Sequence, residues 1–208
     1  PLLMRRFPLV SCFLVAGCVL VFLGQSLAGD YRNHVLILSL GMIPAVLFER
    51  AQLSPELLHI PPLLTLTTHL FVHARWQHLL VNMVFLGFFG SRVEGSLGRS
   101  RFLAFFITCG AFSGLAQAVS DPHSEIPLIG ASGAIFGILG ACLPLFAHKR
   151  IMTGALVFYF FTQFAASFLL EPGKNDDVAW LAHVSGFVAG MALVPLFTGR
   201  GFAGGRLD

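Results

Sequence analysis

A serine set among glycines and a histidine set in an apolar run are the side chains of this sequence best suited to covalent chemistry. Ser132 lies in the segment Gly130-Ala-Ser-Gly133 at the start of one apolar stretch, and His183 lies near the start of a later one. A serine hydroxyl is a weak nucleophile until a base removes its proton, and neutral imidazole suits that task near pH 7. The pair predicts nucleophilic catalysis.

Neither apolar stretch contains an Asp or Glu that could orient the histidine. The predicted arrangement is therefore a Ser-His dyad rather than a triad with a carboxylate. Two simpler interpretations remain open at this point. Small residues around Ser132 also suit close packing of membrane helices, and His183 could make a structural hydrogen bond to a neighbouring helix.

His78 and Asn82 are spaced to share one face of a helix at the start of another apolar stretch. Their side-chain donors, with the backbone N–H of Ser132 at a helix start, could form an oxyanion hole. The competing interpretation is a metal site, because His69 and His73 are also spaced by four residues. There is no HExxH motif and no neighbouring Cys or acidic ligand, so we expect no metal and no cofactor.

The composition requires lipid as the solvent for most of the chain. Of its 208 residues 56% are hydrophobic and 11% charged, and 22 are phenylalanine, whereas soluble domains carry roughly 25% charged residues. Several apolar runs reach the roughly 20 residues that span a hydrocarbon core. The 13 Lys and Arg are scattered in short loops, which excludes a nucleic-acid surface and fits a role in membrane topology.

These runs predict one all-α membrane domain over residues 1–208 with six transmembrane helices. The first run is too long for a typical signal-peptide core, so we expect a retained helix. In this topology Ser132, His183, His78 and Asn82 all lie near the same membrane surface. The expected helices are 8–28, 77–94, 100–119, 130–147, 151–170 and 178–197, with a long outer loop at 29–76.

The distribution of positive charge predicts the orientation. Lys and Arg are concentrated at the N-terminus and in the loops on the same side of the membrane, and cytoplasmic loops carry such an excess. We therefore expect a cytoplasmic N-terminus and an outward-facing active site. The expected location is a bacterial inner (cell) membrane.

In three motifs the sequence resembles the rhomboid family of intramembrane serine proteases. They are His78-x-x-x-Asn82, Gly130-Ala-Ser132-Gly133 and Ala182-His183-x-x-Gly186-x-x-x-Gly190, and they occur in the family's order. The resemblance implies a six-transmembrane-helix rhomboid-like bundle. It implies Ser132 as nucleophile, His183 as general base, His78 and Asn82 as oxyanion stabilisers, and Gly130, Gly133, Phe136, Gly186 and Gly190 as supporting packing. Phe136 matches an aromatic position that packs on the catalytic histidine, and ordinary core packing is the alternative for this ring.

The function expected from this resemblance is that of an intramembrane serine endopeptidase. It would hydrolyse peptide bonds in or near transmembrane segments of other membrane proteins, with those proteins and the lipid bilayer as its partners. The phenylalanine-rich span 151–170 would be a lateral gate or simply a lipid-facing helix. Two alternatives are a catalytically inactive rhomboid-like protein that binds membrane helices, and a small transporter that uses the histidines as a proton relay. The sequence predicts neither the substrate nor the oligomeric state.

Overall fold

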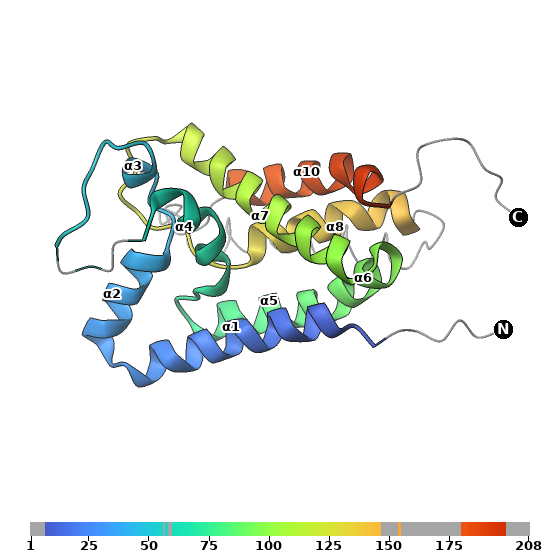
Figure 1. Ribbon diagram of the computed structural model, residues 1–208, viewed down its shortest axis with the longest axis horizontal. Coiled ribbons are helices and arrows are strands. Elements are labelled where there is room, and N and C mark those ends of the chain that lie inside the picture. Colours follow the sequence, from blue (N-terminus) through green and yellow to red (C-terminus); the bar gives the residue numbers. More distant parts are fainter. Residues whose placement is uncertain (1–6, 56, 58–59, 147–153, 155–179, 199–208) are drawn as a thin grey trace, which may run out of the picture.

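The computed structural model describes residues 7–55, 57, 60–146, 154 and 180–198 (Figure 1). This part of the chain is mostly helical and contains no strand beyond the isolated bridge between Met42 and Leu128. Three of its helices are long and apolar enough to cross a membrane: α1 (Leu9–Leu27), α7 (Arg99–Ser120) and α10 (Trp180–Thr198). A fourth apolar helix, α8 (Ser132–Phe146), is shorter.

The expected helix 77–94 is a run of three helical segments without a break. These are α5 (Trp76–Phe85), the π-helical turn η2 (Leu86–Gly90) and α6 (Ser91–Leu97). A π turn changes the register of side chains along a helix. It follows that the face carrying His78 and Asn82 does not continue in the same direction into α6.

The six-helix count remains a prediction. Where helices 8–28, 100–119 and 178–197 are expected, the structure has Leu9–Leu27, Arg99–Ser120 and Trp180–Thr198. Where the helix 130–147 is expected, α8 begins at Ser132. The expected helix 151–170 falls outside the described residues, apart from residue 154. The lateral gate predicted on that helix falls outside them as well.

The segment 29–76, which the sequence predicts as a long outer loop, contains several helices. It contains α2 (Asp30–Leu40), α3 (Pro44–Leu47), α4 (Pro62–Thr68) and the 3-10 turn η1 (His69–Phe71). Proline occupies the start of α3 and α4, where its fixed φ suits a helix and its missing N–H costs nothing. Figure 1 shows α2, α3 and α4 gathered at one end of the molecule.

Helix α8 lies at the centre of the molecule, packed against α7 and α10. Every residue from Gly133 to Cys142 is buried. Its contact with α10 is made by backbone against backbone: a Cβ atom built on Gly186 would lie 2.3 Å from the carbonyl oxygen of Gly133. Small residues permit this approach in membrane helix pairs, and here they fix the start of α10 against the start of α8.

A buried carboxylate attaches α1 to the rest of the bundle. Glu94 of α6 is 4% exposed and accepts hydrogen bonds from the backbone N–H of Val10 at 3.1 Å and of Ser11 at 2.8 Å. It also accepts one from the Ser11 hydroxyl at 2.8 Å. Unpaired N–H groups and a partial positive charge mark the start of a helix, so the carboxylate stabilises the first turn of α1.

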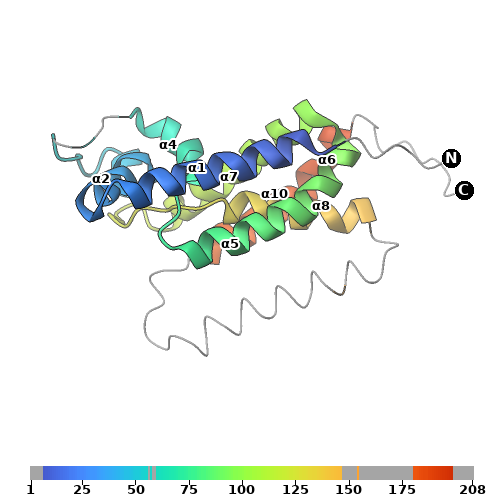
Figure 2. The ribbon, with the colours of Figure 1, turned by 90° about the horizontal axis from the view of Figure 1, so that it is seen from below.

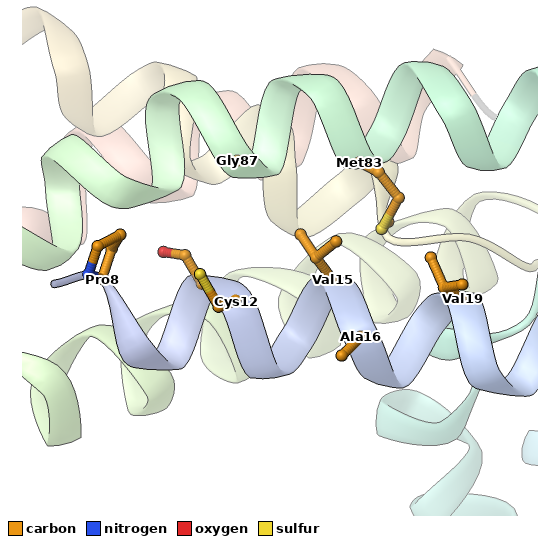
Figure 3. A pocket seen from close by; sticks show the side chains of 8 residues that line it. Pro8, Cys12, Val15, Ala16, Val19, Met83 and Gly87 are labelled. Atoms are coloured by element: carbon orange, nitrogen blue, oxygen red, sulfur yellow. The ribbon is translucent and has the colours of Figure 1, made fainter.

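The outer surface of the helices is apolar, as expected for a protein in lipid. Large exposed side chains include Phe13, Leu20, Val84, Val119 and Val188, which come from four different helical segments. Helices α1 and α5 lie side by side (Figure 2). Between them is an apolar groove of about 370 Å³, lined by Pro8, Ser11, Cys12, Val15, Ala16, Val19, Met83 and Gly87 (Figure 3). None of the predicted site residues lines this groove.

Candidate active site

Ser132 and His183 meet at the starts of α8 and α10. Ser132 is the first residue of α8, and His183 lies in the first turn of α10. The Oγ atom of Ser132 is 2.9 Å from Nε2 of His183, which is within hydrogen-bond distance. The two residues that the motifs single out are therefore neighbours in space, although their catalytic roles remain predictions.

Two aromatic side chains pack against the imidazole of His183. The Phe136 ring stacks on it with centroids 4.4 Å apart and an interplanar angle of 11°. The Trp180 ring meets it edge-on, with centroids 5.9 Å apart. The buried Nδ1 atom has no hydrogen-bond partner within the described part of the chain. Packing against these two rings therefore restricts the orientation of the His183 imidazole.

The chain that leads into Ser132 passes directly against His78 and Asn82. Gly130 has φ +107°, and a Cβ atom built on it would lie 2.6 Å from Cε1 and 2.8 Å from Nε2 of His78. The same Cβ would lie 3.6 Å from Nδ2 of Asn82. Only glycine combines this backbone conformation with so close an approach. The predicted oxyanion residues and the predicted nucleophile are therefore brought to one place.

Backbone hydrogen bonds hold this approach segment. The N–H of Gly130 donates to the carbonyl of His69 at 2.8 Å, and Met42 and Leu128 exchange two backbone hydrogen bonds. The His69 ring is buried, its Nδ1 donates to the carbonyl of Thr65 at 2.8 Å, and burial lowers its pKa from 6.5 to about 4. His69 thus acts as a neutral structural residue beneath the segment.

The start of α10 is tied to α7. The backbone N–H of Ala182 donates to the side-chain oxygen of Gln117 at 3.3 Å. A Cβ atom built on Gly133 would lie 1.8 Å from the Ser113 hydroxyl oxygen, so Gly133 is required where α7 and α8 cross. Gln117 was missed in the sequence, although a polar side chain in an apolar helix is a signal of function.

His73, considered in the sequence only as a metal ligand, contacts Asn82. Its Nε2 lies 3.0 Å from Nδ2 of Asn82, and its ring meets that of His78 with centroids 5.1 Å apart. His69 is directed instead at Thr65 and Gly114. In the described ranges, no three His, Cys, Asp or Glu side chains are grouped so that they could hold a metal ion.

The chain is similar to a set of known membrane proteins. The Rhomboid domain model matches residues 62–200. The chain is 29% identical over 128 residues to the putative rhomboid protease YdcA of Bacillus subtilis, covering 62% of this chain and 64% of that protein. It is 26% identical over 204 residues to the rhomboid protease GlpG of Salmonella choleraesuis, covering 91% of this chain and 67% of that protein. It is 30% identical over 131 residues to RHOMBOID-like protein 5 of Arabidopsis thaliana, covering 60% of this chain and 40% of that protein.

The chain spans less than two thirds of the length of YdcA and of RHOMBOID-like protein 5. All the predicted site residues nevertheless fall within the matched domain, which covers more than half of the chain. Together with its apolar helices, this match makes the protein an integral membrane protein. The predicted resemblance is confirmed, and the chain belongs to the rhomboid family.

Proposed function

We propose that this protein is an intramembrane serine endopeptidase that hydrolyses peptide bonds in or near transmembrane segments of other membrane proteins. The observation that carries the proposal is the 2.9 Å contact between Oγ of Ser132 and Nε2 of His183. It joins a residue type that can act as a nucleophile to one that can act as its base. Several relatives, including YdcA and GlpG, are named proteases, which supports the same reaction class.

In the proposed reaction the Ser132 hydroxyl donates its hydrogen bond to Nε2 of His183, which puts the imidazole proton on Nδ1. Oγ then attacks the carbonyl carbon of the scissile peptide bond while its proton passes to Nε2. General base catalysis of this kind contributes roughly 100- to 10,000-fold to the rate. The imidazolium next protonates the leaving amine, the C–N bond breaks and an acyl-enzyme on Ser132 remains. Water, activated by His183, hydrolyses the ester.

The oxyanion formed in each step needs donors placed before the reaction. His78 and Asn82 are suited to supply them, because both lie against Gly130, two residues before the nucleophile. Asn82 is 4% exposed, and a hydrogen bond in such a dry place is stronger than one in water. Loss of one such donor typically lowers turnover about 100- to 1,000-fold.

The substrate follows from where the site lies. A peptide bond inside a stable helix is protected from attack by its own hydrogen bonds, so a transmembrane substrate must unwind near the cut. Glycine, proline and polar residues weaken helices, and we propose that segments containing them are preferred. We further propose a cytoplasmic N-terminus, an outward-facing site and a bacterial inner membrane, supported by the distribution of Lys and Arg.

The test compares cleavage of a model transmembrane substrate in liposomes by the parent protein, Ser132→Ala and His183→Ala. Matched controls are Ser26→Ala, whose hydroxyl bonds its own helix backbone, and His34→Ala on the exposed side of α2. The proposal expects the two site variants to lose cleavage and the two controls to retain it. Cleavage by Ser132→Ala at the rate of the parent would exclude Ser132 as the nucleophile.

The inactive alternative needs a readout that does not depend on the choice of substrate. A fluorophosphonate reacts covalently with an activated serine, so it should label the parent and not Ser132→Ala. A folded parent protein that neither cleaves nor becomes labelled would support a rhomboid-like protein that only binds membrane helices.

A further inference from the structure

We propose that His73 is a positioning residue that holds the Asn82 amide in the orientation needed to donate to the oxyanion. This inference rests on the proposed peptide hydrolysis at Ser132. His73 lies between η1 and α5 and is fully buried. Its imidazole has one partner on each nitrogen, and together these partners fix both its tautomer and the direction of the bond to Asn82.

The first nitrogen determines the tautomer. Nδ1 of His73 lies 3.3 Å from the carbonyl oxygen of Phe71. A carbonyl oxygen only accepts hydrogen bonds, so Nδ1 carries the proton. In a neutral imidazole the other nitrogen, Nε2, is then an acceptor.

The second nitrogen determines how the Asn82 amide is turned. Nε2 of His73 lies 3.0 Å from the Asn82 side chain. If the Oδ1 atom of Asn82 faced it, two acceptors would meet in a buried place, which is costly. The NH₂ group must therefore face His73 and donates one of its two N–H bonds to it. The other N–H is left for a second acceptor on the side of Gly130, whose missing Cβ would lie 3.6 Å from Nδ2.

The His73 imidazole stays neutral near pH 7. Burial, and then the charge of neighbouring His78, lower its pKa from 6.5 to about 4, although the bond to Phe71 acts in the opposite direction. A protonated ring would present N–H at Nε2 and lose its bond to Asn82. Nε2 is thus an acceptor throughout the range in which a Ser-His pair works.

Hydrogen bonds from helix α1 fix the backbone of His73. Gln25 is 2% exposed, and its side-chain oxygen accepts from the N–H of His73 at 3.3 Å. Its amide nitrogen donates to the carbonyl of His73 at 3.2 Å and to Asn33 at 2.9 Å. The Gln25 side chain therefore forms hydrogen bonds with both the backbone N–H and the backbone carbonyl of His73. Burying a polar side chain in an apolar membrane helix costs free energy. The hydrogen bonds to His73 and Asn33 offset this cost for Gln25.

The proposed effect of His73 on the reaction passes through Asn82. Without the Nε2 acceptor, the Asn82 amide can turn and present its oxygen to the oxyanion, which repels it. Because the oxyanion exists only after attack, the loss falls on kcat and leaves KM nearly unchanged. We expect His73→Ala to lower kcat about tenfold or more, and by no more than the roughly 100-fold expected for loss of Asn82 as a donor.

The test is a double-mutant cycle with His73→Ala, Asn82→Ala and the double variant, measured as kcat and KM for a transmembrane substrate. Coupled residues give non-additive effects. We expect the His73 substitution to reduce kcat in the parent and to produce no further reduction once Asn82 is alanine. Losses that multiply in the double variant, or an unchanged kcat in His73→Ala, would overturn the proposal.

A second pair of variants distinguishes a positioning role of His73 from a role in folding. This pair also provides a test if His73→Ala does not fold. His73→Gln retains an oxygen acceptor toward Asn82, whereas His73→Asn retains a donor toward Phe71 and is too short to reach Asn82. We expect the Gln variant to have the higher kcat at similar thermal stability. Equal losses in both would overturn the proposal. The parent protein and Ser132→Ala are measured in the same experiment. Cleavage that depends on Ser132 can persist while the His73 prediction fails, so the test distinguishes the proposed hydrolysis from the proposed positioning role.

Discussion

Gly190 of α10 lies so close to Gly137 of α8 that a Cβ atom built on it would sit 1.8 Å from the Gly137 carbonyl oxygen. No side chain at position 190 fits without moving the helices apart. The same two helices carry Ser132 and His183 on their first turns. The separation of their backbones therefore decides whether the hydroxyl and the imidazole meet.

Gly190→Ala is expected to lower both stability and activity. Overpacking a close contact costs about 1–3 kcal/mol of unfolding free energy, and the shift of α10 lengthens the bond between Ser132 and His183. The matched control is Gly24→Ala in α1, where an added Cβ meets nothing within 4 Å. Thermal unfolding and cleavage of a transmembrane substrate should show losses for Gly190→Ala only. Equal behaviour of the two variants would contradict the tight contact.

Gly130→Ala is expected to reduce kcat by about 100-fold or more, because its Cβ would displace the His78 ring from the oxyanion site. The control is Gly98→Ala. Gly98 also has a positive φ, +84°, but an added Cβ there meets nothing within 4 Å. Both variants carry backbone strain on the order of 1–3 kcal/mol, and only the first has the clash. Steady-state kinetics at matched folded fraction separates the two effects.

Phe136 is expected to act through its ring. Phe136→Tyr retains the aromatic surface that stacks on His183 at 4.4 Å and should retain most of kcat. Phe136→Leu keeps an apolar side chain but loses the flat contact, so the imidazole can turn away from Ser132 and kcat should fall. Fluorophosphonate labelling rates should follow the same order. Labelling of Phe136→Leu as fast as Phe136→Tyr would show that the ring is ordinary core packing.

Glu94→Gln is expected to destabilise the protein and leave the site intact. The substitution removes the negative charge at the start of α1 and one of the two oxygens that accept from Val10 and Ser11. The unfolding free energy should fall by about 1–3 kcal/mol. Ser11→Ala, which removes a single hydroxyl bond, should cost less. Denaturation curves give the order, and kcat per folded molecule at low temperature should match the parent.

The amino-acid sequence by itself determined the class of protein and the identity of the central residues. A mean composition with so few charges can only be satisfied in lipid, and this follows from residue counts without any contact. Ser132 and His183 stand out because each is unusual for its local sequence. Ser132 is a hydroxyl residue among glycines, and His183 is an ionisable residue in an apolar helix. Both signals are short-range, so a single sequence carries them.

The tertiary structure alone decided what lies beside those residues. Gln25 forms hydrogen bonds with His73, which lies 48 residues away in the chain. Glu94 caps α1 through Ser11, from which it is separated by 83 residues. No periodicity or local motif encodes such pairings, because they depend on how the helices pack. The helices within 29–76 were missed for a related reason: their propensity is weak and interrupted by proline, and contacts such as that of Met42 with Leu128 stabilise them. Local chemistry thus predicts Ser132 and His183 as a nucleophile and its base, and long-range packing determines which side chains lie against them.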